Sequence, residues 1–188
     1  MAFIDVIQHD AAEGELKEIY DNLVKSRGKL AEVHKIQSLN PKSIMLHMEL
    51  YLHIMFGKSP IKRVHREMMA VVVSRANNCD YCQVHHAEAV NHYWKDDERT
   101  EQLKKDYQQA SLTEMELKLC DLASELTKDP GGHSDEKHLK PLRDLGVSDR
   151  GILDATLVIA YFNFVNRLVL GLGVQLEAGE GSGGYNYD

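Results

Sequence analysis

Strand signals are almost absent from the 188 residues, because few short alternating runs of β-branched and aromatic residues stand between turn signals. The chain also has no long Lys/Arg run, and its formal net charge is −7. That charge argues against a general nucleic-acid or anionic-membrane surface. No phosphate loop, nucleophile elbow or dinucleotide fingerprint is present. The absences favour a helical protein outside the nucleotide- and nucleic-acid-binding classes.

The N-terminus and the cysteines indicate the compartment. Residues 1–8 are short, carry Asp5 and lack the basic and apolar regions of a signal peptide. The three cysteines are an odd count, which does not suggest a secreted disulfide framework. The longest apolar run, 152–176, contains polar residues that are costly in lipid. They are Asp154, Asn163, Asn166, Arg167 and Gln175. We therefore expect a soluble, cytoplasmic protein without a membrane partner.

Helix signals recur along the whole chain. Apolar spacing and capping residues predict helices over about 11–26, 31–38, 41–56, 60–76, 80–94, part of 95–107, 113–127, 135–144 and 148–170. Asp10 with Glu13 reads as a capping box for the first of them. The length suits one domain. We predict a single all-α domain of about seven to nine helices over 1–176, followed by a Gly/Ser-rich tail over 177–188.

A Cys-x-x-Cys pair stands at the expected start of the helix over 80–94. At about 100° per residue, Cys79, Cys82 and His86 fall near 0°, 300° and 340°, so they share one face. His85 lies about 100° from His86, and Tyr81 falls near the opposite face. Thiolates are stabilised at helix starts, and the two-residue spacer lets the sulfurs form a disulfide. The pattern indicates redox chemistry.

A carboxylate is expected beside this pair. If the helices before and after Asn77-Asn78 pack antiparallel, Glu67 falls opposite about residue 88, which is about 3 Å along the axis from His86. A carboxylate next to an imidazole orients the ring and raises its basicity. Glu67, His86 and the two cysteines thus form a possible proton-relay and thiol constellation.

These residues carry a family resemblance. The spacing is Glu-x11-Cys-x2-Cys-x3-His, here Glu67, Cys79, Cys82 and His86. It resembles the signature of the alkylhydroperoxidase D-like (AhpD-like) proteins of the carboxymuconolactone decarboxylase superfamily. The segment 161–167, Tyr-Phe-Asn-Phe-Val-Asn-Arg, is similar to the uncharacterised peroxidase-related subgroup. The likeness is strongest over 59–91 and extends over about 112–176.

The resemblance implies an AhpD-like all-α fold, often assembled into trimers or hexamers, and peroxide reduction. Cys82 would attack the hydroperoxide and become a sulfenic acid, and Cys79 would resolve it to a disulfide. Glu67 and His86 would relay protons through water. The best-known members have a histidine between the two cysteines, where this chain has Tyr81, which alters part of the relay. Tyr81 is therefore a possible member of the surrounding shell of the site.

We thus expect a cofactor-independent, thiol-dependent peroxidase that acts on organic hydroperoxides or hydrogen peroxide. An external dithiol or thioredoxin-like donor would recycle it. One alternative is a carboxymuconolactone decarboxylase-like enzyme that uses Glu67 and His86 as acid and base. The other is a non-enzymatic oligomeric protein with a relic disulfide or a structural zinc, for which the four motif residues are possible ligands.

Other residues with reactive or polar side chains are expected to have mainly structural roles. Cys120 lies among leucines and is interpreted as a buried apolar residue. His85 is interpreted as a hydrogen-bonded or interface histidine, with a supporting role at the site as the alternative. The side chains expected mainly to pack are His47, Tyr51 and His53. Polar groups inside an apolar helix need partners, in the same subunit or across an interface. This applies to Asn163, Asn166 and Arg167.

Overall fold

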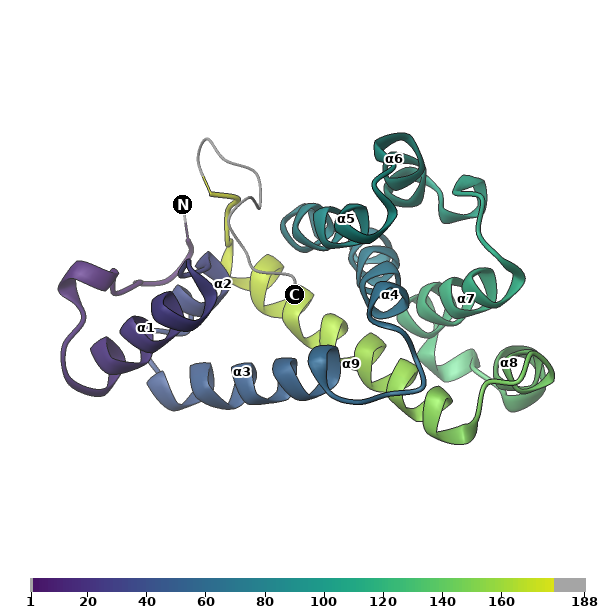
Figure 1. Ribbon diagram of the computed structural model, residues 1–188. Coiled ribbons are helices and arrows are strands. Elements are labelled where there is room, and N and C mark those ends of the chain that lie inside the picture. Colours follow the sequence, from purple (N-terminus) through teal and green to yellow (C-terminus); the bar gives the residue numbers. More distant parts are fainter. Residues whose placement is uncertain (1, 178–188) are drawn as a thin grey trace.

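A computed structural model describes residues 2–177, and helices form nearly all of its regular structure (Figure 1). No strand occurs within that range, which confirms the all-α prediction. The α-helices of the described part are α1 (Gly14–Arg27), α2 (Glu32–Lys35), α3 (Pro41–Phe56), α4 (Arg63–Ala76), α5 (Asp80–Trp94), α6 (Asp97–Lys105), α7 (Glu114–Lys128), α8 (Lys140–Asp144) and α9 (Asp149–Leu172). Apart from Glu177, the predicted Gly/Ser-rich tail lies outside the described residues.

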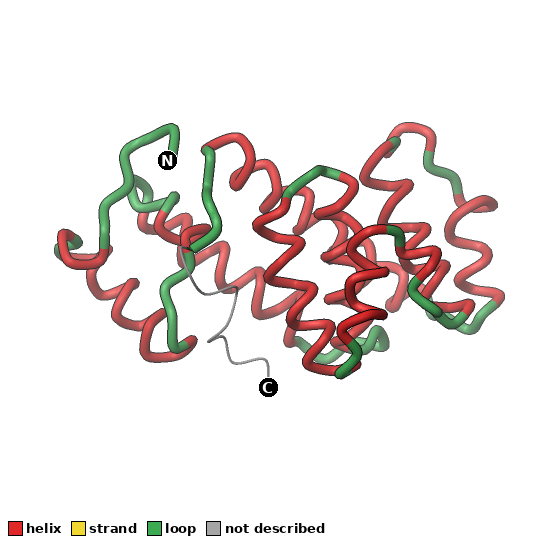
Figure 2. Tube along the Cα trace, turned by 90° about the horizontal axis from the view of Figure 1, so that it is seen from above, coloured by secondary structure: helices red, strands yellow, loops and turns green. Residues whose placement is uncertain are grey.

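The helix α9 divides the molecule into two parts. It crosses between α1–α3 on one side and α4–α8 on the other (Figure 1). Seen from above, the described part of the molecule is longest along the line that runs from α1–α3 to α4–α8 (Figure 2). One apolar cluster is built mainly from α1 and α3, and a larger one from α4, α5, α7 and α9. Cys79 and Cys82 belong to the larger cluster, and Tyr51 packs against both.

Two predicted helix starts are confirmed at the residues that signal them. Pro41 occupies the first turn of α3, and Thr113 forms a capping box with Glu116 at the start of α7. The predicted Asp10/Glu13 capping box is wrong. Asp10 belongs to a 3-10 turn, and α1 begins only after Glu13, whose side chain makes no capping hydrogen bond.

The start of α4 also differs from its prediction, at Arg63 instead of residue 60. The intervening loop is held by Arg66, which is 6% exposed. Its guanidinium donates hydrogen bonds to main-chain carbonyls of the end of α3 and of the loop. The acceptors are the carbonyl oxygens of Ile54, Met55, Gly57 and Ile61, at 2.8–3.1 Å. These bonds satisfy carbonyls that the end of α3 would otherwise leave unpaired, and residues 57–62 stay outside the helices.

The helix α9 is long and apolar enough to cross a membrane by length and composition alone. In this fold it packs as a core helix, with Val158, Ile159 and Phe162 buried in the larger cluster. Its polar interruptions find partners within the same chain. Asn163 and Asn166 both accept hydrogen bonds from the Asn77 amide, at 3.0 Å each. The amide contacts therefore tie α9 to the turn before α5.

Candidate functional site

The turn between α4 and α5 positions the Cys-x-x-Cys pair. Asn78 takes up a left-handed conformation, with φ of 55°, which ends α4 and reverses the chain. The Cys79 N–H then donates to the Ser74 carbonyl oxygen at 2.8 Å. Cys79 caps α5 with φ −100° and ψ 86°, so it stands outside the helical repeat. Its side chain therefore does not follow the 100° progression that places Cys82 and His86 on one face.

Glu67 and His86 are in direct contact across the antiparallel pair α4 and α5. His86 Nδ1 lies 2.6 Å from Glu67 Oε2, and Arg63 Nε donates to Glu67 Oε1 at 2.7 Å. Glu67 is fully buried. Burial opposes its ionisation, but His86 and Arg63 outweigh this and hold the pKa of Glu67 below its ordinary value. An ionised carboxylate only accepts, so His86 Nδ1 carries the hydrogen and donates it to Glu67. In the neutral form of the ring, Nε2 is then the atom that can act as a base.

The two cysteines differ in their surroundings, although both are buried free thiols. The pKa of Cys79 is lowered, because the Cys82 thiol and then the Cys82 backbone N–H favour its thiolate. The pKa of Cys82 is raised well above its ordinary value by the hydrogen bond to Cys79 and by burial. When the pair loses one proton, the thiolate is therefore favoured on Cys79, and the remaining proton on Cys82.

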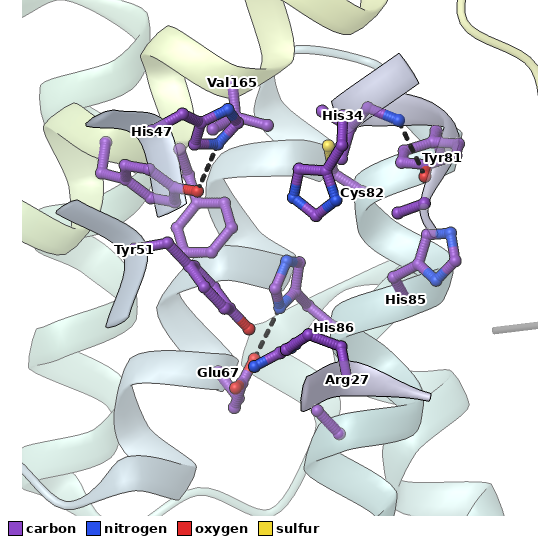
Figure 3. A pocket seen from close by; sticks show the side chains of 15 residues that line it. Arg27, His34, His47, Tyr51, Glu67, Tyr81, Cys82, His85, His86 and Val165 are labelled. Atoms are coloured by element: carbon purple, nitrogen blue, oxygen red, sulfur yellow. Dashed lines mark hydrogen bonds and ion pairs between the residues drawn. The ribbon is translucent and has the colours of Figure 1, made fainter. Parts of the chain in front are cut away.

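A cavity of about 90 Å³ opens beside Cys82. Cys82, Glu67 and His86 line it, whereas Cys79 is not among its lining residues. Figure 3 shows the Cys82 sulfur, the His34 ring and the His86 ring around the same space. His86 also packs edge-on against Phe162, with ring centroids 4.4 Å apart. A small molecule in this cavity would therefore meet Cys82 and not Cys79.

The opposite wall comes from the other part of the molecule. Arg27 and His34 reach in from α1 and α2, and His47 and Tyr51 from α3. His47 and Tyr51 thus line the cavity in addition to packing, while His53 does not line it. His47 Nε2 lies 2.7 Å from the Tyr161 hydroxyl of α9. Burial lowers the pKa of His47 to about 4, so the ring is neutral at neutral pH.

The predicted orientations of Tyr81 and His85 are wrong. Tyr81 was expected near the opposite face of α5 and His85 away from His86, yet both line the same cavity. The reason is that α2 and residue Glu177 wrap around the start of α5, so the cavity meets more than one face of that helix. Tyr81 donates to Glu177 Oε1 at 3.1 Å, and His85 Nε2 lies 3.2 Å from Glu177 Oε2.

The family profile described as carboxymuconolactone decarboxylase matches residues 45–99, which include the whole Glu-Cys-Cys-His motif. The chain shares 28% identity with an uncharacterized peroxidase-related protein from Silicibacter sp. TM1040, with a TM-score of 0.86 and 94% and 92% of the two chains covered. These two matches support the assignment of the chain to the AhpD-like proteins of the carboxymuconolactone decarboxylase superfamily. The segment 59–91, on which the resemblance was strongest, lies within the matched range.

Two further solved structures share the fold of this AhpD-like chain. An AhpD-core, peroxidase-related protein from Ralstonia eutropha JMP134 has 20% identity, a TM-score of 0.84 and coverage of 94% and 93% of the two chains. A variant of the debrominase Bmp8, in complex with 2,3,4-tribromopyrrole, has 19% identity, a TM-score of 0.77 and coverage of 94% and 92%. No curated protein matches the chain. The likeness to this family indicates an enzyme-like protein.

The structural-zinc alternative finds no support in the geometry. Among residues 2–177, no three His, Cys, Asp or Glu side chains are grouped as a metal site.

Cys120 is fully buried within α7, and burial raises the pKa of its thiol, as expected for a packing residue. Sequence reasoning missed His34, Arg27 and Tyr161 as cavity residues. The spacing of His47 and Tyr51, four apart on one helix face, was the available signal for that wall.

Proposed function

We propose that this AhpD-like protein is a thiol-dependent peroxidase that reduces small organic hydroperoxides or hydrogen peroxide. One observation carries the proposal: Cys82 lines the cavity together with the Glu67–His86 pair. Cys79 does not line the cavity but contacts Cys82, so it can form a disulfide with it. An attacking thiol needs access to substrate, a base and a resolving thiol. The proposal gives these three roles to Cys82, His86 and Cys79.

The proposed cycle balances without a cofactor. His86 Nε2 takes the Cys82 proton, directly or through one water. The Cys82 thiolate attacks the outer peroxide oxygen, the O–O bond breaks, and the leaving alkoxide takes up that proton to become an alcohol. Cys79 then gives up its proton, and its thiolate attacks the sulfur of the Cys82 sulfenic acid. The disulfide forms, and the departing hydroxide takes up the Cys79 proton and leaves as water. Glu67 stays ionised and orients His86 throughout.

Two electrons must return to the protein in each cycle. We propose that an external dithiol or thioredoxin-like donor supplies them by thiol-disulfide exchange, which fits a cytoplasmic protein. The donor would leave as its own disulfide and restore both thiols. Because Cys82 faces the cavity and Cys79 does not, the donor thiolate is expected to attack the Cys82 sulfur.

The experiment that tests the proposal is a titration of the reduced protein with tert-butyl hydroperoxide, followed by intact mass and peptide mapping. One equivalent should remove two hydrogens per chain and link Cys79 to Cys82. A thioredoxin-like donor should then sustain continuous peroxide consumption. Cys120→Ser is the matched control and should behave as the wild type, because the Cys120 thiol is fully buried. A protein that remains fully reduced in excess hydroperoxide would contradict the proposed function.

A second candidate reaction is reductive removal of halogen from a small aromatic ring. It is favoured by the aromatic cavity wall, to which Tyr51, Tyr81, Tyr161 and Phe162 contribute. Here the dithiol would be oxidised to the disulfide while the carbon–halogen bond is replaced by carbon–hydrogen and halide is released. Offering 2,3,4-tribromopyrrole in place of the hydroperoxide separates the two. Bromide release with no response to peroxide would favour the second candidate.

We propose in addition that the protein forms a homo-oligomer, a trimer or hexamer, through an apolar stripe on α3 and α9. The stripe consists of Leu46, Leu50, Leu153, Leu157 and Phe164, which are 38–54% exposed. Exposed apolar surface of this kind is typical of protein–protein interfaces. We expect Leu157→Glu to lower the mass in sedimentation velocity. Leu52→Glu, on another face of α3 and also exposed, should leave it unchanged, and equal masses for wild type and Leu157→Glu would contradict the stripe.

A further inference from the structure

We propose that the Tyr161 hydroxyl is a fixed hydrogen-bond donor that holds the acceptor group of a small, uncharged substrate beside Cys82. His47 and Gln37 are the positioning residues that aim it. The inference deepens the proposed function, because it assigns the wall of the cavity opposite Glu67–His86. It rests on three successive hydrogen bonds, from the Val33 carbonyl through Gln37 and His47 to Tyr161. The donor in each bond follows from the fact that the Val33 carbonyl can only accept.

The chain begins at Gln37, whose amide orientation is fixed by the backbone. Its side-chain Nε2 lies 2.8 Å from the Val33 carbonyl oxygen, which can only accept. The amide therefore presents its NH₂ group, and not its oxygen, to that carbonyl. The same Nε2 lies 2.8 Å from His47 Nδ1. Its second hydrogen consequently points at His47, and His47 Nδ1 must accept.

The tautomer of His47 determines whether the Tyr161 hydroxyl accepts or donates in the bond between them. Burial keeps the His47 ring neutral at neutral pH, since its pKa is lowered to about 4. A neutral imidazole that accepts at Nδ1 carries its hydrogen on Nε2. Nε2 lies 2.7 Å from the Tyr161 hydroxyl oxygen and is marked by a dashed line in Figure 3. The Tyr161 oxygen is thus the acceptor in this bond, and its own hydrogen is free to donate elsewhere.

Nothing within residues 2–177 accepts that hydrogen by a hydrogen bond of the protein itself. Tyr161 lines the cavity that Cys82 also lines. Burial raises the pKa of Tyr161 well above its ordinary value, and the nearby Tyr51 and Cys82 add to this effect. The phenol therefore stays protonated, and the free hydrogen is available to a molecule inside the cavity.

A second, independent observation indicates a polar ligand in the same space. His34 Nδ1 is buried and has no hydrogen-bond partner among the described residues, and Figure 3 shows the ring beside Cys82. Burial, with help from His47, lowers the pKa of His34 to about 3, so this ring is also neutral. A wall of neutral hydrogen-bonding groups set among aromatic rings suits an uncharged molecule with one or two polar atoms. The cavity, of about 90 Å³, admits only a small one.

The first test measures the tautomer of His47 directly. Long-range ¹H–¹⁵N correlation spectra of the wild type should show His47 as the neutral form with hydrogen on Nε2. The opposite tautomer, with hydrogen on Nδ1, would overturn the proposal, because Tyr161 would then donate to His47 and hold no hydrogen for a ligand. This result does not depend on any catalytic activity.

The second test compares the wild type with Tyr161→Phe, which keeps the ring and removes only the hydroxyl. Cyclopentanone, a small acceptor without a donor, should protect Cys82 from alkylation by iodoacetamide. The concentration that halves the alkylation rate should rise about three- to tenfold in Tyr161→Phe, the range expected for one neutral hydrogen bond. The matched control is Tyr107→Phe, which removes a hydroxyl bonded to Asp121 outside the cavity.

Peroxide kinetics complete the comparison and keep the two proposals apart. With tert-butyl hydroperoxide, KM should rise about three- to tenfold in Tyr161→Phe while kcat changes little, since the bond holds bound substrate. Equal protection and equal KM in wild type and Tyr161→Phe would overturn the role of Tyr161 but leave the peroxidase proposal intact. If the wild type ignores peroxide, the peroxidase proposal fails, and the alkylation and tautomer results still decide the role of Tyr161.

Discussion

Replacing Cys82 by serine should abolish peroxide turnover, with a loss of at least about a thousandfold, the size typical of removing an enzyme nucleophile. Cys79→Ser should differ in kind. Its Cys82 can still attack one peroxide, but no resolving thiol follows, so the reaction stops after a single turnover with a sulfenic acid on Cys82. Stopped-flow peroxide consumption and dimedone labelling with mass spectrometry measure the two outcomes.

The asymmetry of the pair makes this comparison informative. Cys79 has the lowered pKa, whereas Cys82 lines the cavity. Reactivity decided by thiolate character alone would place the sulfenic acid on Cys79, and it would then form in Cys82→Ser. That result would reverse the assignment. Both variants should keep the wild-type helical content and melting temperature within a few degrees, which shows that a lost reaction is not a lost fold.

Replacing Glu67 by glutamine should lower the free energy of unfolding by about 3–5 kcal/mol, as measured by urea denaturation at pH 7. The reason is that Arg63 and His86 lose the carboxylate that compensates their partial burial, and breaking one partner of a buried ion pair typically has this effect. Asp144→Asn is the matched control. Its ion pair with Lys140 is exposed, so its removal should leave the free energy of unfolding nearly unchanged.

The same substitution has a pH signature whose sign is fixed. The folded-state pKa of Glu67 is lower than the unfolded value of about 4.5. Its contribution to stability is therefore complete above that unfolded value and is lost as the pH falls through the folded pKa. The stability difference between wild type and Glu67→Gln should shrink over that acidic range. A difference that stays constant from pH 7 into the acidic range would contradict an ionised, paired Glu67.

Local signals in the sequence were sufficient for most helices and for half of the site. The starts of α3, α5, α7 and α9 follow residues with one physical task, such as Pro41 in a first turn and Ser148 as an N-terminal cap. The Glu67–His86 contact follows from two helices joined by a short turn, because antiparallel neighbours pair residues at equal distances from that turn. Both inferences need only residues close in sequence.

The opposite wall could not be predicted in this way. His47 and Tyr161 meet across 114 residues of sequence, and His34 lines the same cavity. Their meeting depends on how α1–α3 pack against α9. Periodicity shows that such residues face inward but not which neighbours they face. The misplaced Tyr81 has the same cause, because the helical wheel describes α5 correctly but contains nothing of α2 or Glu177, which enclose its first turn.

The third cysteine gives the folded protein a built-in reference for its own oxidation state. Cys120 lies sealed within α7, and its thiol stays protonated, so peroxide that reaches Cys82 leaves it untouched. Alkylation after denaturation should therefore label three cysteines in the reduced chain and only Cys120 in the chain that has closed its disulfide. The relative amounts of the singly and triply labelled chains report the fraction of the protein that is oxidised. This holds in any mixture, including a cell extract, without an external standard.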